Sequence, residues 1–224
     1  MRYRWVPGSF LDSLTPPACA ELLGLGVPRR FPSGRRLLRE GERNSHVEIL
    51  LSGFLKITTL VEGLEALQAI RMPGDIVGET GALSGRPRMA NVTTCGRVTA
   101  SVVSSAEFRR FLRNHPDAAF NMTAIMGERL RWANQRRSEF AAYPAEVRLA
   151  RVLYEIATTC GQRTDAGVTI DISLSQPELA TMIGIANATA EKAIHDLRAR
   201  GIIRTGYRSI TVVDLDALAA FAYL

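Results

Sequence analysis

Residues 187–200 carry polar side chains at the spacing of a single helix face. Asn187, Glu191 and His195 follow one another at intervals of four residues, and Ala188 and Lys192 lie beside them. An asparagine can pair with an adenine edge, a lysine can donate to guanine, and a glutamate can accept from cytosine. The spacing therefore predicts a helix that can read base edges in DNA. The alternative is a surface used only for contacts with proteins.

The basic residues around this face supply the other requirement of a DNA-binding surface. The chain has a formal net charge of +6 and a pI near 9.7. The excess lies in residues 1–116, so the overall charge does not by itself locate a DNA-binding domain. Residues 187–208, however, contain five basic and two acidic side chains, which can meet phosphates. The residues predicted to contact DNA are Gln176, Asn187, Ala188, Thr189, Glu191, Lys192, His195, Arg198 and Arg208.

Two short helices are expected to position these side chains. Ser175 can cap the first helix, Pro177 suits its first turn, and Glu178 stands at the capping-box position. Gly184 can end that helix with a left-handed turn, and the second helix then covers about residues 187–200. Its inward face is predicted to consist of Ala190, Ala193, Ile194 and Leu197. Two short strands flanking Gly206 complete the pattern of a winged helix-turn-helix.

A long helix is expected before this domain. Residues 118–142 contain no proline, and Ala119, Met126, Ala133 and Phe140 recur every seven residues, flanked by Met122 and Leu130. A seven-residue stripe favours the pairing of two helices in a dimer, and the alternative is a helix packed on its own domain. Pro144 disfavours helix at the residues before it, so a hinge is expected at 142–143.

The first half of the chain has the pattern of an antiparallel β-structure. Between about residues 31 and 104, short β-rich runs at 47–51, 54–60, 66–71, 76–78, 91–94 and 98–103 alternate with turns. A short helix is expected at 16–25, and another is expected to begin at Ser105. The fold class is therefore α+β: an antiparallel, jelly-roll-like β-roll, a long dimerisation helix and a C-terminal winged helix-turn-helix domain. The predicted boundaries are 1–116, 117–142 and 143–224.

Composition excludes several other classes of protein. With 46% hydrophobic and 22% charged residues, the 224-residue chain is expected to be globular. We find no apolar run long enough to span a membrane and no signal-peptide pattern, so a cytoplasmic location is expected. The three cysteines and three histidines show no metal-ligand spacing, so no metal is expected. No nucleophile elbow or Walker loop is present in the sequence, which argues against an enzyme.

From about residue 20 to residue 220, the chain resembles the CRP/FNR family of bacterial transcription regulators. The runs REGE at 39–42 and LSGF at 51–54 are similar to early turns of the family's β-roll. The run PGDIVGETGALSGRPRMA at 73–90 resembles the family's phosphate-binding cassette, and the long helix and helix-turn-helix follow in the family's order. The resemblance implies a homodimer on a pseudo-palindromic operator in double-stranded DNA. Members of the family commonly contact RNA polymerase.

The resemblance also implies a cyclic-nucleotide site, with cAMP as the expected ligand. In the family cassette, the carboxylate at the position of Glu79 accepts from the ribose hydroxyl, and the guanidinium at the position of Arg88 holds the cyclic phosphate. Gly78 and Ala90 would let the backbone approach the ligand, and Asn134 on the long helix could bond a purine. The family's usual serine or threonine beside the arginine is Met89 here. The alternative is an ion pair between Glu79 and Arg88 in a vestigial pocket, in a regulator with a different ligand or none.

The reading helix departs from the family's common pattern as well. The family's SRETVxR is ANATAEK here, at residues 186–192. Its arginine and glutamate readers thus become Asn187 and Ala188, and its last arginine becomes Lys192. The serine that caps the family's helix becomes Ala186, unless Asn187 caps instead. The operator is therefore expected to differ from the one that the family's catabolite activator reads.

Overall fold

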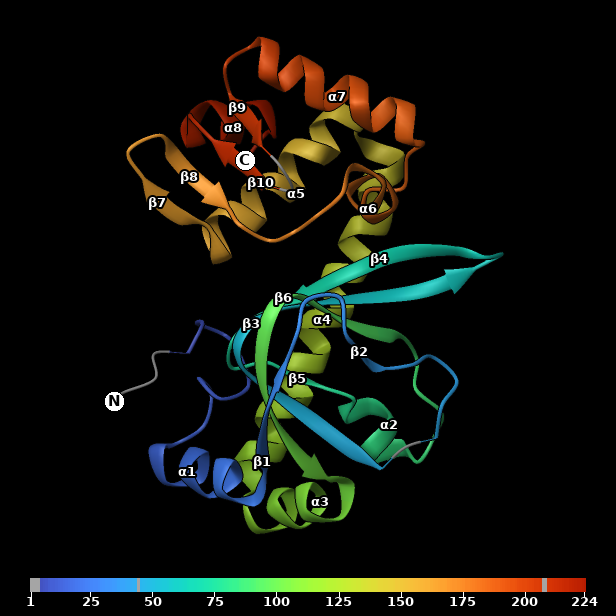
Figure 1. Cartoon of the computed structure of the whole chain (residues 1–224), viewed down its shortest axis with the longest axis vertical. Coiled ribbons are helices and arrows are strands. Elements are labelled where there is room, and N and C mark those ends of the chain that lie inside the picture. Colours follow the sequence, from blue (N-terminus) through green and yellow to red (C-terminus); the bar gives the residue numbers. More distant parts are fainter. Residues whose placement is uncertain (1–4, 44, 207–208) are drawn as a thin grey trace. The chain divides into compact units, whose positions relative to one another are not determined.

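The computed structural model describes residues 5–43, 45–206 and 209–224. The chain forms two compact units, Met1–Arg131 and Trp132–Leu224 (Figure 1). The boundary falls inside the long helix α4 (Pro116–Ala142), two residues longer at its start than the expected 118–142. Each unit is described separately below.

The first unit is built on an antiparallel sheet with strand order β1-β6-β3-β4. Its strands are β1 (Val27–Phe31), β2 (Arg36–Leu38), β3 (His46–Val61), β4 (Leu64–Arg71), β5 (Ile76–Val77) and β6 (Asn91–Ser104). β2 pairs with β6, and β5 pairs with β3. The predicted antiparallel β-roll is confirmed.

Two of these strands are longer than the sequence pattern predicts. The runs expected at 47–51 and 54–60 form the single strand β3, and those at 91–94 and 98–103 form the single strand β6. The pairing of β3 with β6 shifts register between Leu50 and Ser52 and again between Ser52 and Phe54, and Gly53 at the second shift has φ of +84°. Gly53 therefore lies in a bulge that bends β3 without ending it, since a glycine accepts this left-handed conformation.

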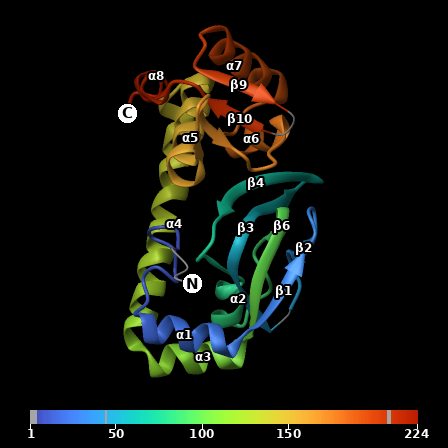
Figure 2. The same ribbon diagram turned by 60° about the vertical axis from the view of Figure 1, so that its left-hand side comes forward.

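Helices cover one end of the roll. α1 (Pro16–Leu25) occupies the residues expected for it and packs beside α3 (Ser105–Asn114) (Figure 2). α3 begins at Ser105, as expected. Its N-cap is Ser104, whose side chain accepts from the backbone N–H of Glu107. The six-residue helix α2 (Glu79–Ser84) follows β5.

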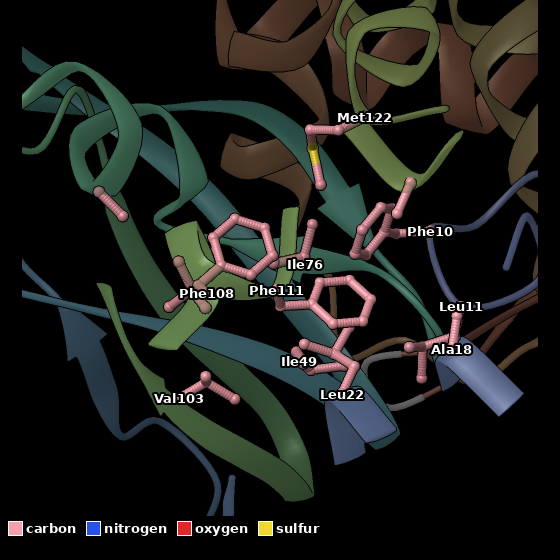
Figure 3. Packing of buried hydrophobic residues seen from close by; sticks show 13 residues of the cluster. Phe10, Leu11, Ala18, Leu22, Ile49, Ile76, Val103, Phe108, Phe111 and Met122 are labelled. Carbon is pink, nitrogen blue, oxygen red and sulfur yellow. The ribbon is translucent and has the colours of Figure 1, made fainter. Parts of the chain in front are cut away.

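The core of this end is apolar and joins all of these elements (Figure 3). Phe10 and Phe108 meet edge to face with ring centroids 6.2 Å apart. Phe111 and Leu22 are buried with them. Burying a large apolar side chain stabilises a fold by about 1.5–3 kcal/mol, so this cluster holds the helices on the roll.

The start of α4 belongs to the same core, which corrects part of the predicted dimerisation stripe. Met122 is 2% exposed and Met126 packs against the same cluster, so both residues face their own subunit. The exposed apolar residues on this part of α4 are instead Phe120 at 72% and Leu130 at 63%, with exposed Gly127 between them. A heptad stripe indicates one apolar face of a helix but not the partner that packs on it, and here part of that face packs on its own domain.

The second unit joins helices to a small antiparallel sheet. After the end of α4 come α5 (Ala145–Cys160), β7 (Gln162–Thr164), β8 (Gly167–Ile170), α6 (Gln176–Met182), α7 (Asn187–Ala199), β9 (Ile203–Gly206), β10 (Ser209–Val212) and α8 (Leu215–Phe221). The strand order is β7-β8-β10-β9. α5 buries Val147, Ala150, Leu153 and Ala157 on one face, and α8, capped by Asp214, was not predicted.

Candidate functional site

The helix pair α6–α7 forms as predicted. The Ser175 hydroxyl accepts from the backbone N–H of Glu178, and the Glu178 carboxylate accepts from the backbone N–H of Ser175, which is a complete capping box. Gly184 has φ of +66°, the left-handed conformation expected at the turn. α7 buries the predicted inward residues Ala190, Ala193, Ile194 and Leu197. The pair is a helix-turn-helix.

The outward face of α7 is open to solvent. Gln176 on α6 is exposed too, and Arg208 lies outside the described residues. Ala186 is the N-cap of α7 and makes no side-chain cap hydrogen bond. The first N–H groups of α7 are therefore not capped by that side chain. The predicted contact residues on α7 that the structure exposes are Asn187, Ala188, Thr189, Glu191, Lys192, His195 and Arg198.

A basic hollow adjoins the second half of α7. It has a volume of about 480 Å³ and is lined by His195, Arg198, Ala199, Ile203, Arg204 and Thr205. Arg204 stands on β9 and is exposed, as are His195 and Arg198. The β9–β10 hairpin is the predicted wing. Helix and wing thus present cationic side chains around one concave surface, the chemistry that phosphate groups require.

A second candidate site lies in the first unit, where Arg88 is buried. Its Nη1 donates to the carbonyl of Gly78 at 2.5 Å and its Nη2 to the carbonyl of His46 at 2.5 Å. Burial lowers the pKa of the Arg88 guanidinium, while the nearby carboxylates of Glu48, Glu79 and Glu42 act in the opposite direction. A Cβ at Gly78 would lie 2.5 Å from Nη1 of Arg88, so this approach requires glycine.

Glu79 is also buried, and its partner is a residue that the sequence analysis did not single out. Nη1 of Arg129, on α4, donates to Oε1 of Glu79 at 2.8 Å. Nη2 of the same guanidinium donates to the Ile76 carbonyl at 3.1 Å and lies 3.4 Å from Oδ1 of Asp75. The pairing of Glu79 with Arg88, weighed above as an alternative, is replaced by an ion pair between Glu79 and Arg129.

The sequence did contain a signal for Arg129. It follows Met122, Ile125 and Met126 at helical spacing, so it falls on the face of α4 that packs against the core. A charged residue on such a face needs a carboxylate partner. Burial, and then the charge of Arg129, lower the pKa of neighbouring Arg71 to about 10.

The other predicted nucleotide-site residues are more exposed. Met89 is 67% exposed, and Ala90 is half-buried. Asn134 is exposed on α4 in the second unit, and its role stays a prediction. No group of three or more metal-ligating side chains occurs among the residues that the structure describes. Within the same residues, no helix is both long and apolar enough to cross a membrane.

Comparison with known families matches both units. Residues 28–115 match the model of the cyclic nucleotide-binding domain, and residues 147–221 match that of the Crp-like helix-turn-helix domain. Together with the β-roll, the long helix and the helix-turn-helix, these matches define a transcription regulator and not an enzyme. The chain belongs to the CRP/FNR family.

Its relatives include regulators described as responding to cAMP. The "CRP-like cAMP-activated global transcriptional regulator" of Mycobacterium tuberculosis is 28% identical over 209 residues, covering 93% of both chains. The "Cyclic AMP receptor protein" of Thermus thermophilus is 24% identical and covers 87% of this chain and 88% of its own.

Solved structures agree on the fold. A CooA variant from Carboxydothermus hydrogenoformans superposes with a TM-score of 0.75 at 21% identity, covering 98% of each chain. The c-di-GMP-responsive regulator CLP of Xanthomonas campestris gives a TM-score of 0.76 at 17% identity, covering 89% of this chain and all of its own. At these identities the likeness concerns the fold alone.

Proposed function

We propose that this protein is a homodimeric, sequence-specific DNA-binding regulator whose operator affinity is controlled by a cyclic nucleotide, cAMP, bound in the β-roll. Gln176, the outward residues of α7 and Arg208 would contact the operator. Two copies would meet half-sites about one helical turn apart. Contact with RNA polymerase and a cytoplasmic location complete the proposal.

The observation that carries the DNA part of this proposal is the exposure of every predicted reader on α7. The inward face of the same helix is apolar and buried, so α7 can present its polar face without losing its packing. Lys192 and Asn187 have the donors that purine edges accept.

The proposal of nucleotide binding rests on two buried residues of opposite charge in the β-roll, Arg88 and Glu79. Arg88 supplies a guanidinium fork for a cyclic phosphate, and Glu79 supplies a carboxylate for a ribose hydroxyl. Arg88 lies against the backbone next to Glu79, because its Nη1 donates to the carbonyl of Gly78. The residues present therefore fit a sugar phosphate. Binding at Glu79 would compete with its pairing to Arg129.

Calorimetric titration of the purified protein with cAMP and cGMP tests the pocket. Arg88→Gln is expected to weaken nucleotide binding about tenfold or more, because hydrogen bonds to a charged group are lost. Arg86→Gln, at an exposed position in the same cassette, serves as the matched control and should bind like wild type. Equal affinity of Arg88→Gln and wild type would remove Arg88 from the site.

The main alternative is a regulator of the same fold with a vestigial pocket or another ligand. It is favoured by the bonds that Arg88 and Glu79 already make within the protein. Selection of bound sequences from random duplex, with and without cAMP, separates the two functions. Operator binding that is indifferent to both nucleotides would support the alternative.

A further inference from the structure

The last turn of α4 touches the turn of the helix-turn-helix. A Cβ added to Gly184 would lie 3.0 Å from Cζ of Phe140 and 3.2 Å from both of its Cε atoms, so the face of the ring, near its Cζ end, lies against the glycine. Phe140 is 45% exposed, although its ring faces a neighbour. Any residue other than glycine at position 184 would have a Cβ that displaces this ring. Such a residue would also have to adopt the left-handed conformation of Gly184.

Arg148 of α5 contacts the same turn and the same ring. Its Nη1 donates to the carbonyl of Ile183 at 2.9 Å, directly before Gly184. The guanidinium carbon lies 5.3 Å from the centre of the Phe140 ring, within the range of a cation–π contact. Phe140 and Arg148 thus form one small assembly against residues 183–184, where α6 ends.

The segment that carries Phe140 is itself fixed to α5. Glu139 is 4% exposed and accepts from Nη1 of Arg136 at 2.8 Å and from Nε of Arg151 at 2.9 Å. Arg136 also pairs with Glu155, which accepts from the Trp132 indole at 2.5 Å. Glu139 has two charged partners, Arg136 and Arg151, whose side chains are only 10% and 12% exposed, so the last turns of α4 have one favoured arrangement on α5.

We propose that Phe140 and Arg148 are positioning residues for the reading helix: they fix residues 183–184, and through them the start of α7, on the end of the long helix. This inference rests on the proposed function of α7 as the DNA reader. Neither residue needs to contact DNA. Their effect is to restrict the directions in which α7 can present its polar face.

Specific and non-specific binding should respond differently to their loss. Non-specific affinity depends on the number of cationic groups near phosphates, which Phe140→Ala does not change. Specific affinity depends on side chains reaching base edges together, and a less restricted α7 must lose conformational freedom on binding. The ratio of the two affinities therefore reports positioning, whereas a general loss of folded protein would lower both.

The experiment measures fluorescence anisotropy with a selected operator and with a scrambled duplex, each with and without cAMP. For Phe140→Ala we expect operator affinity to fall about fivefold or more, and affinity for the scrambled duplex to stay within about twofold. Phe140→Tyr keeps the ring and should behave as wild type. Ser138→Ala, on the same turn of α4 and exposed, is the control.

A second variant keeps the test decisive if Phe140→Ala does not fold. Arg148→Gln removes the bond to Ile183 and should also lower the ratio, whereas Arg163→Gln, an exposed charge on β7, should not. If the ratio of operator affinity to scrambled-duplex affinity is unchanged in folded Phe140→Ala or Arg148→Gln, this inference is overturned but the proposed function is not. If wild type has no preference for any duplex, the proposed function and this inference fail together.

Discussion

The carboxylate of Glu79 and the guanidinium of Arg129 show how a single residue can connect the β-roll to the long helix. Their side chains are only 10% and 20% exposed, and Asp75 adds a second carboxylate at 3.4 Å from the same guanidinium. A buried ion pair need not stabilise a fold relative to an apolar pair, but removing one partner leaves an uncompensated charge. Arg129 therefore contributes to stability as well as to the candidate pocket.

Replacing Arg129 tests this interpretation. Arg129→Gln is expected to lower the free energy of unfolding by about 2–3 kcal/mol, because Glu79 and Asp75 lose their charged partner in a partly buried site. Urea unfolding followed by circular dichroism measures the change. Arg131→Gln is the matched control, since its pair with Glu128 is 75% and 65% exposed and should be worth less than about 1 kcal/mol. Equal effects of the two variants would contradict a special role for Arg129.

Lys192 is the proposed DNA-contacting residue whose contribution can be measured most directly. Lys192→Ala should weaken operator binding by about 1–3 kcal/mol and relax the preference at one base position. Selection of bound duplexes with the variant reveals which position is relaxed. Arg163→Ala removes an exposed positive charge from β7 and should leave the selected sequence unchanged. A variant that selects the wild-type operator at full affinity would exclude Lys192 from the readers.

At the scale of elements, α4 has two faces with different tasks. One face carries Met122 and Met126 into the core of the roll. The other exposes Phe120 and Leu130 with Gly127 between them, and a glycine on a helix surface permits close approach of a second helix. The proposed dimer therefore uses this second face and not the stripe of residues 119, 126, 133 and 140.

A charge placed on this face should separate the subunits. Leu130→Arg is expected to shift the protein from dimer to monomer in sedimentation velocity at micromolar concentration, since two guanidinium groups would be buried close together. Leu64→Arg is the matched control, because Leu64 is 61% exposed on β4 and Leu130 63% exposed on α4. A dimer that survives Leu130→Arg, or a wild type that sediments as a monomer, would contradict the proposed interface.

At the scale of the whole molecule, the proposed regulation requires that nucleotide and operator influence each other equally. If cAMP raises operator affinity by some factor, operator must raise cAMP affinity by the same factor, and a typical coupling lies between about 5-fold and 150-fold. Calorimetric titration of cAMP into the free protein and into its operator complex measures one side of this cycle. Anisotropy with and without cAMP measures the other. A factor of one on both sides would show that cAMP and operator binding are not coupled, and would contradict the proposed regulation.

Many structural features of this protein depend on residues close together in the sequence and could therefore be predicted from it. The capping box at Ser175 and Glu178, the left-handed turn at Gly184 and the inward face of α7 each depend on neighbours within a few residues. The short helix at residues 16–25 and the paired strands of the wing belong to the same class. Periodicity and turn chemistry are sufficient for features of this kind.

Contacts between distant residues needed the tertiary structure. Residues 79 and 129 are paired across fifty positions of the chain, and no local pattern specifies which carboxylate meets which guanidinium. Heptad spacing indicates an apolar face of α4 but not the partner that packs on it. Phe140 likewise meets Gly184 only because α5 carries the turn back to the end of α4. Local sequence determined the helices and strands and the exposed polar face of α7. Packing in three dimensions decided the partners of the buried charges, because burial and charge pairing depend on neighbours that the chain brings together only when it folds.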